Sequence, residues 1–324
     1  MIAKILLFLF FIASLQAALV QIDFSMGGGY RRDDFHYKNY ASGNPDKINN
    51  FFSLPEINSA QQALYLNFIW DNFRLETEGD FGWIVTGKDM VGFPYNNGGP
   101  SLFFSFKNIY GYEADGMGSL GYTCSLYRSQ FLDFDFVPFA GFKYWHLATR
   151  VKGNKTDNLA PYYGFTSFAT YYESILQHAD FWGPYLEGRL NFNFSQMVNL
   201  LAYYQYHFVF MRIKSIPTLN YVLEPSDATV YYTVVGSRSI IKDNNSKAQV
   251  GGLDIYFKTL ADVLVGVRFY ASRFYTHDAK TYTSQTTATM PNNSYFVSED
   301  IENVYSSKVT WTTYSFVLYA GYHF

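Results

Sequence analysis

The 324 residues carry a formal net charge of −3 at pH 7, with 16% charged and 21% aromatic side chains. A soluble domain averages about 25% charged residues, so an ordinary soluble enzyme is disfavoured, and without a basic excess nothing supports a nucleic-acid partner. The mean hydropathy of −0.10 argues against a bundle of membrane helices. Composition leaves two classes open: a soluble aromatic-rich sandwich, and a barrel whose lipid-facing side chains alternate with polar lumen side chains.

The first 17 residues have the layout of a secretory signal peptide. Lys4 precedes an apolar run over residues 5–12, and small and polar residues follow as far as Ala17. The run is shorter than the about 20 apolar residues that a spanning helix needs, and a retained anchor is the alternative. We therefore predict export, a signal peptide over residues 1–17 and a mature domain over residues 18–324.

From Val20 onward, apolar and polar side chains alternate with a period of two, which is typical of strands with one apolar and one polar face. The strand segments that this pattern predicts are, in chain order, 20–26, 64–70, 73–78, 113–126, 139–145, 165–194, 200–210, 253–258, 263–272 and 313–324. The short turns between them are 71–72, 128–133, 195–196 and 259–262, and the long connections are 31–58, 87–100, 152–158, 215–245 and 276–306. The long sixth segment could instead contain an extra hairpin.

The short and long connections alternate strictly along the chain. Outer-membrane barrels have this arrangement, with short periplasmic turns, long extracellular loops and an even number of strands. We therefore predict an all-β fold, a transmembrane antiparallel β-barrel of about ten strands, with about eight to twelve possible. Its place would be the bacterial outer membrane, in contact with the lipid.

The last predicted strand ends on an aromatic residue. One face of this strand presents Phe316, Leu318, Ala320, Tyr322 and Phe324. A terminal aromatic on an amphipathic last strand resembles the signal by which the barrel-assembly machinery recognises outer-membrane proteins. We therefore predict that machinery as a partner of the C-terminal strand.

Charged side chains of both signs lie on the polar faces, several of them beside turns. The predicted lumen-lining residues are Arg74, Glu76, Glu78, Glu113, Asp115, Glu187, Arg189, Asp254, Lys258 and Arg268. About eight strands leave an interior that side chains just fill, whereas 16–18 leave an open channel. We predict a lumen plugged by paired charges and a structural or surface-exposed role; a narrow porin for small solutes is the alternative.

The sequence predicts no catalytic, cofactor-binding or metal site. The six histidines are scattered without metal-ligand spacing, and the single cysteine, Cys124, allows neither an intramolecular disulfide nor a cysteine-based metal cluster. Loops on a rigid scaffold carry the variable contacts of such proteins. Any host or envelope partner is therefore expected at the five long loops.

Four short motifs resemble known outer-membrane families. They are Gly-Gly-Tyr-Arg-Arg-Asp at 28–33, the strand from Asp115 to Gly121-Tyr122, Val-Pro-Phe-Ala-Gly-Phe at 137–142 and Trp-Gly-Pro-Tyr-Leu-Glu-Gly at 182–188. They are similar to the Protochlamydia-type outer-membrane protein family of environmental chlamydiae. That resemblance implies a barrel and an outer-membrane location, and it implies no established activity.

The ten-strand plan and the motif at 182–188 also resemble the omptin outer-membrane proteases. That resemblance would imply an acidic pair on the second external loop and an Asp-His pair on the fourth. The second loop has Asp89 alone, and the fourth has Glu224, Asp227 and Asp243 but no histidine. Without an imidazole the carboxylate lacks the partner that activates water in that scheme, so we predict that the chain is not an enzyme and keep an omptin-like protease as a second alternative.

Overall fold

The computed structural model describes residues 20–40, 48–93, 102–106, 108–152, 167–194, 197–224, 230–259, 262–276, 279–291, 296–298 and 303–324. The predicted signal peptide lies outside these residues and stays a prediction. The described residues form strands throughout, and among them there is no helix long and apolar enough to cross a membrane.

The strands are β1 (Val20–Tyr40), β2 (Ile48–Trp70), β3 (Phe73–Thr86), β4 (Asp89–Phe93), β5 (Leu102–Phe106), β6 (Asn108–Tyr122), β7 (Cys124–Arg128), β8 (Leu132–Lys152), β9 (Ser167–Phe194), β10 (Val198–Glu224), β11 (Val230–Lys258), β12 (Val263–Tyr275), β13 (Ala279–Pro291), β14 (Phe296–Ser298) and β15 (Asn303–His323).

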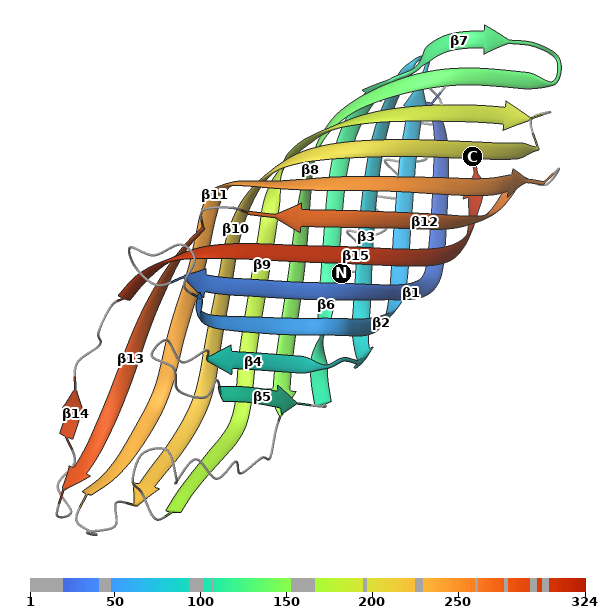
Figure 1. Ribbon diagram of the computed structural model, residues 1–324. Helices are drawn as coiled ribbons and strands as arrows, with labels where there is room; N and C mark the ends of the chain where they lie inside the picture. Colours follow the sequence, from blue (N-terminus) through green and yellow to red (C-terminus); the bar gives the residue numbers. More distant parts are fainter. Residues whose placement is uncertain are drawn as a thin grey trace, which may run out of the picture.

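Ten of these strands close into a barrel. β1, β2, β3, β6, β8, β9, β10, β11, β12 and β15 pair antiparallel with their neighbours in this order, and β15 pairs back with β1 (Figure 1). The closing seam runs without interruption from the pair Asp23–His323 to the pair Tyr40–Ser306. Closure leaves no unpaired edge in lipid, which is the condition for strands to cross a membrane. The predicted all-β antiparallel barrel of about ten strands is confirmed.

Short connections and the chain end form one rim of the barrel. Asp71 has a φ of 55° and stands in the two-residue turn between β2 and β3, where Asp tolerates the left-handed conformation. The C-terminal Phe324 exchanges backbone hydrogen bonds with Ile22 on β1. Short turns are typical of the periplasmic end of an outer-membrane barrel, so we assign this rim to the periplasm.

A band of apolar side chains covers the outer wall above this rim. On β3 the outward positions run from Phe73 through Leu75 and Phe81 to Trp83, and ten residue steps of about 3.3 Å tilted by about 40° span about 25 Å. Between Phe73 and Trp83 no outward position of β3 carries a charged side chain. Aromatic side chains at both margins, Tyr122 below and Tyr144 above among them, form the belts typical of the two membrane interfaces.

Most of the residues that were predicted as long loops are strands. β1 continues to Tyr40 and β2 begins at Ile48, while β10 continues to Glu224 and β11 begins at Val230. β9 is a single strand of 28 residues without an extra hairpin. Figure 1 shows β9, β10, β11 and β13 reaching well beyond the other strands at the end opposite the short turns.

The side-chain pattern inverts above the lipid, which is why these segments look like loops in the sequence. Tyr30 faces outward in the band, whereas Phe35 and Tyr37, higher on β1, are buried inside while His36 faces out. Outside the bilayer the outer wall meets water and becomes polar. The interior there is filled by apolar side chains, and the residues of this cluster are Phe35, Tyr37, Phe52, Leu54, Ile57, Ile84, Ile109, Trp145, Leu147, Ala179, Phe181, Val209, Met211, Ile213, Ile241, Ala248, Phe274, Ala279, Val309 and Trp311.

Candidate functional site: the barrel lumen

The interior of the barrel is divided along its axis into three layers. A polar cavity lies at the periplasmic end, ion pairs cross the bore above it, and the apolar cluster fills the extracellular part. Strand alternation creates the two lower layers, because inside the lipid band every second side chain must turn to the lumen.

Arg189 on β9 links two strands of the wall by ion pairs. Its two terminal nitrogens donate to both carboxylate oxygens of Glu76 on β3 at 2.6 and 2.7 Å, and its Nε donates to Glu187 at 2.7 Å. Gln205 on β10 donates to the other oxygen of Glu187 at 2.8 Å. The fork of a guanidinium matches a carboxylate in this way, so β3 and β9 are joined through the bore and not through the sheet.

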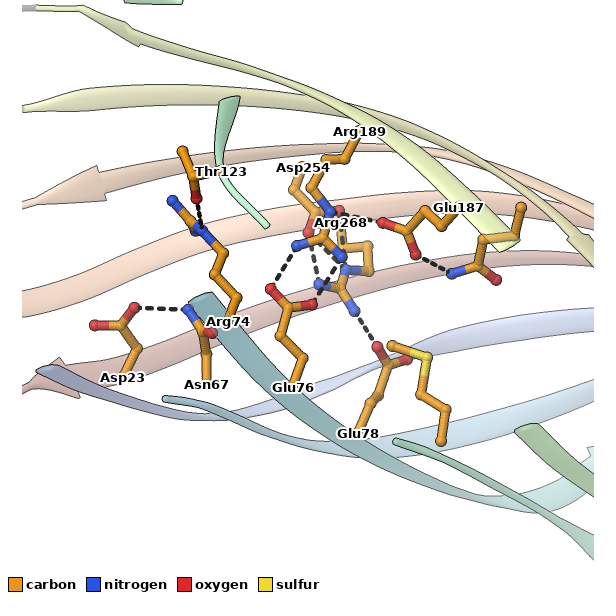
Figure 2. Close-up of polar contacts among 12 residues, drawn as sticks. Asp23, Asn67, Arg74, Glu76, Glu78, Thr123, Glu187, Arg189, Asp254 and Arg268 are labelled. Atoms are coloured by element: carbon orange, nitrogen blue, oxygen red, sulfur yellow. Dashed lines mark hydrogen bonds and ion pairs between the residues drawn. The ribbon is translucent and has the colours of Figure 1, made fainter. Parts of the chain in front are cut away.

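Arg268 on β12 makes a corresponding link to the next inward-facing residue of β3, two residues after Glu76. It donates to Glu78 at 2.6 Å and to Asp254 on β11 at 2.6 Å. Its guanidinium also stacks 4.1 Å from the ring centroid of Tyr65 on β2. Figure 2 shows Glu76 and Glu78 side by side on β3 with their carboxylates directed at Arg189 and Arg268.

A third cluster lies higher in the bore around Arg31 on β1. Its guanidinium contacts Asp33 at 3.0 Å, Glu113 at 3.1 Å and Asp115 at 2.7 Å. Trp311 donates from its indole Nε1 to Asp33 at 2.7 Å, which ties the cluster to the apolar layer above. All four charged side chains are at most 3% exposed.

Carboxyl groups outnumber cations in the buried bore. Lys143 on β8 is buried with its ammonium 5.1 Å from the ring centroid of Trp145, and it makes no ion pair within the described part of the chain. Asp80 on β3 is buried too, and within the described residues neither of its carboxyl oxygens has a hydrogen-bond donor. With the three arginine clusters, four cationic side chains face eight carboxyl groups; the latter are Asp33, Glu76, Glu78, Asp80, Glu113, Asp115, Glu187 and Asp254.

The periplasmic cavity has a volume of about 450 Å³. Arg74, whose Nε donates to Thr123 at 2.8 Å, and Asn67, whose amide donates to Asp23 at 3.1 Å, project into it (Figure 2). Arg74 makes no ion pair with any carboxylate that the structure describes. The cavity ends at Arg189 and Arg268.

Above the cavity the bore narrows to voids that hold about one water each. One void of about 10 Å³ lies beside Lys143, and another of about 10 Å³ lies between Trp145 and Trp311. A void needs about 10–15 Å³ of such volume to hold a single water. Ion pairs and aromatic side chains lie between the cavity and the extracellular end.

All ten predicted lumen residues lie on the inner wall, and seven of them line the cavity. The seven that line the cavity are Arg74, Glu76, Glu78, Arg189, Asp254, Lys258 and Arg268. Glu187 is bonded to Arg189, while Glu113 and Asp115 lie higher, around Arg31. Lys258 is placed at the rim and pairs with Asp262 of the adjacent turn at 3.3 Å.

The five residues of the predicted assembly signal line the outward face of β15 and the chain end. Leu318, Tyr322 and Phe324 are 57%, 42% and 54% exposed, and Phe316 and Ala320 alternate with them on the same face. The recognition of this strand by an assembly partner stays a proposal.

Several interior residues were missed by the sequence prediction. The predicted connection over residues 31–58 includes Arg31 and Asp33, although the residues that follow, Phe35-His36-Tyr37-Lys38, still alternate and predict a continuing strand. Asp80 follows Glu78 at a spacing of two and falls on the same face.

The structure also contains a His–Asp pair that the sequence did not predict. His146 on β8 lies 2.7 Å from Asp180 on β9, and the hydroxyl of Tyr144 donates to the same carboxylate oxygen at 2.6 Å. Since Trp145 and Leu147 point inward, His146 faces outward, so this pair belongs to the outer wall and not to the lumen. Among the described residues no group of three or more His, Cys, Asp or Glu side chains could hold a metal ion.

Comparison with solved structures supports the fold. The outer membrane protease OmpT from Escherichia coli superposes with a TM-score of 0.63 at 11% identity, covering 94% of this chain and 97% of that one. The outer membrane protein OprG from Pseudomonas aeruginosa matches at 11% identity over 93% of this chain and 95% of its own, with a TM-score of 0.31. At such identities the likeness to OmpT concerns the fold alone. No curated protein matches the sequence.

The sequence model of one family covers most of the chain. It is described as Protochlamydia outer membrane protein and matches residues 25–324, from the first barrel strand to the C-terminal phenylalanine. This match agrees with the closed barrel, its apolar outer band and the aromatic belts, and it confirms the predicted location in the bacterial outer membrane. The chain belongs to the Protochlamydia outer membrane protein family.

Proposed function

We propose that this protein is a non-conducting, non-enzymatic scaffold of the outer membrane that presents its extended extracellular strands and loops at the surface. The observation that carries the proposal is the packing of side chains inside the bore. Above the periplasmic cavity, ion pairs around Arg189, Arg268 and Arg31 are followed by a packed apolar cluster.

Breaking this plug is costly, which supports a permanent closure. Removing one partner of a buried ion pair costs about 3–5 kcal/mol, and the apolar layer excludes the water that an ion would need. A pore with the same fold would need a continuous water-filled path. The two voids above the cavity measure only about 10 Å³ each, which is too narrow for such a path.

Liposome swelling tests this proposal. Vesicles that contain the folded protein are expected not to swell faster in isosmotic arabinose or glycine than empty vesicles, with a general porin as the positive control. Swelling that rises in proportion to the amount of folded protein would reject the scaffold and favour the alternative.

A narrow porin is the second candidate, and the cavity favours it. The polar space of about 450 Å³ already opens the periplasmic part of the bore. Since carboxyl groups outnumber cations in the layers above, such a pore would be selective for cations. A cation-selective current that disappears on replacement of Asp80 and Asp115 by asparagine would support this function.

Proteolysis by an omptin-like scheme gains no support from the arrangement of His146 and Asp180. This pair faces outward at the upper margin of the lipid band, and Tyr144 shares its carboxylate oxygen. We therefore expect a fluorogenic peptide to stay uncleaved by the folded protein. Cleavage that the variant His146→Ala retains would place an active site elsewhere on the barrel.

The assembly role of the last strand is tested by the variant Phe324→Ala. We expect a clear loss of the heat-modifiable, folded form in outer-membrane fractions, because the terminal aromatic is the element that the assembly machinery would read. His323→Ala on the opposite face of the same strand is the matched control and is expected to assemble. Equal assembly of both variants would remove this role from Phe324.

A further inference from the structure

A row of cations crosses the outer wall just above the lipid band. Arg212 on β10 stands directly opposite Lys242 on β11, and Lys242 stands directly opposite Lys280 on β13. Their neighbours Met211, Ile241 and Ala279 are buried inside the barrel. The three cations, which are named here the outer cationic row, therefore face outward on adjacent strands about 5 Å apart.

The height of the row is set by the aromatic pair beneath it. Trp182 and Phe210 stack with ring centroids 6.3 Å apart at the upper margin of the apolar band, and Arg212 is the next outward residue after Phe210 on β10. Two residue steps along a tilted strand raise its Cα by about 5 Å. This places Arg212 at the height where the headgroups of the outer leaflet begin.

The nearby carboxylates do not neutralise the row. Asp180, which pairs with Arg212 in register, gives its Oδ1 to His146 and Tyr144 on the other side. Asp243, next to Lys242, accepts hydrogen bonds from Ser246 at 2.7 Å and from Thr276. The Nε of Arg212 is buried without a hydrogen-bond partner, and no ion pair joins the three cations to any carboxylate within the described ranges.

Elsewhere on the outer wall, two cations lie beside a carboxylate. There Glu56 bridges Lys88 at 2.6 Å and Arg32 at 3.5 Å. The hydrogen bond and charge of Lys88 lower the pKa of Glu56, which lies above the lipid band on β2. Among the described residues no carboxylate forms such a bridge to the row on β10, β11 and β13.

Like charges directly opposite each other on neighbouring strands destabilise a sheet, so three in succession call for an external anion. Phosphate matches a guanidinium flanked by ammonium groups. We propose that the outer cationic row binds the phosphate group of a phosphorylated outer-leaflet lipid, whose acyl chains lie along the apolar band beneath Phe210. The lipid origin follows from the position of the row, directly above a surface that only lipid covers.

Native mass spectrometry of the detergent-purified, folded barrel tests this proposal. The wild type is expected to retain dioleoyl phosphatidic acid in preference to dioleoyl phosphatidylcholine, whose phosphate is shielded by choline. The variant with Arg212→Gln, Lys242→Gln and Lys280→Gln is expected to bind phosphatidic acid about 100-fold more weakly, because each basic side chain near an anionic lipid contributes about fivefold.

The matched control is the double variant Arg32→Gln and Lys88→Gln, which removes outward cations that Glu56 already neutralises. It is expected to keep the wild-type affinity, and heat-modifiable migration on gels verifies that all variants are folded. Unchanged binding by the triple variant, equal loss in the control, or equal affinity for the two lipids would overturn the proposal. Tight binding of inorganic phosphate alone, with displacement of the lipid, would overturn the lipid origin and identify a soluble anion instead.

Discussion

Replacement of Arg189 by methionine is expected to lower the free energy of unfolding of the barrel by about 3–5 kcal/mol. The guanidinium is 9% exposed and holds Glu76 and Glu187 at 2.6 and 2.7 Å. Its removal leaves two carboxylates inside the bore without their cation, and the remaining hydrogen bond of Gln205 to Glu187 cannot replace the charge. Urea unfolding in phospholipid vesicles, followed by tryptophan fluorescence, measures the loss.

Two further variants separate the buried charge from the side chain itself. Arg32→Met removes an exposed arginine of the outer wall and is expected to change the unfolding midpoint little, because exposed ion pairs contribute little. Adding Glu76→Gln and Glu187→Gln to Arg189→Met is expected to recover most of the stability. If Arg189→Met is as mild as Arg32→Met, the ion pairs do not hold the bore closed.

Replacement of Phe181 by alanine is expected to cost about 3–5 kcal/mol of unfolding free energy. The ring lies inside the extracellular half of the barrel, 1% exposed, with its centroid 4.4 Å from that of Phe274 and 4.9 Å from that of Trp311. Alanine leaves a cavity that the surrounding closed wall cannot collapse to fill. The same urea titration measures the effect.

Phe208 on β10 is the matched control for this variant. It is 51% exposed on the outer wall of the barrel, where lipid fills the space that alanine vacates. Phe208→Ala is expected to cost only about 0.5 kcal/mol. Similar costs for both variants would mean that the upper interior is not packed as a core.

The strands within the lipid band were predictable from the sequence because every outward side chain there meets the same apolar solvent. Lipid requires an apolar outward face, so residues such as Phe73, Leu75 and Leu318 alternate with polar inward ones, and the strand positions, the closure and the inner wall follow. The ten predicted lumen residues are on that inner wall for this reason.

The extracellular half escaped prediction because the same alternation changes sign there. Phe35 and Tyr37 turn inward and His36 turns outward, so the segment appears polar when it is judged by the lipid-facing rule. If the alternation is accepted with the apolar side chains facing either outward or inward, it extends β1 to Tyr40 and places Arg31 and Asp33 in the lumen.

The partners of the lumen charges could not be predicted from local pattern. Arg268 pairs with Glu78 across 190 residues of sequence, and Arg212 faces Lys242 across a hairpin in which the strands contain a bulge. Such pairings depend on the register and on which side chains reach across the bore. They become visible only when all ten strands are placed together.

Planar-bilayer recording of the purified, folded protein tests the occluded bore most directly. An occluded bore predicts a flat baseline at high protein load and at either voltage sign, under conditions in which a general porin gives steady conductance steps. Regular steps from the wild-type protein, with a size set by salt concentration, would contradict it.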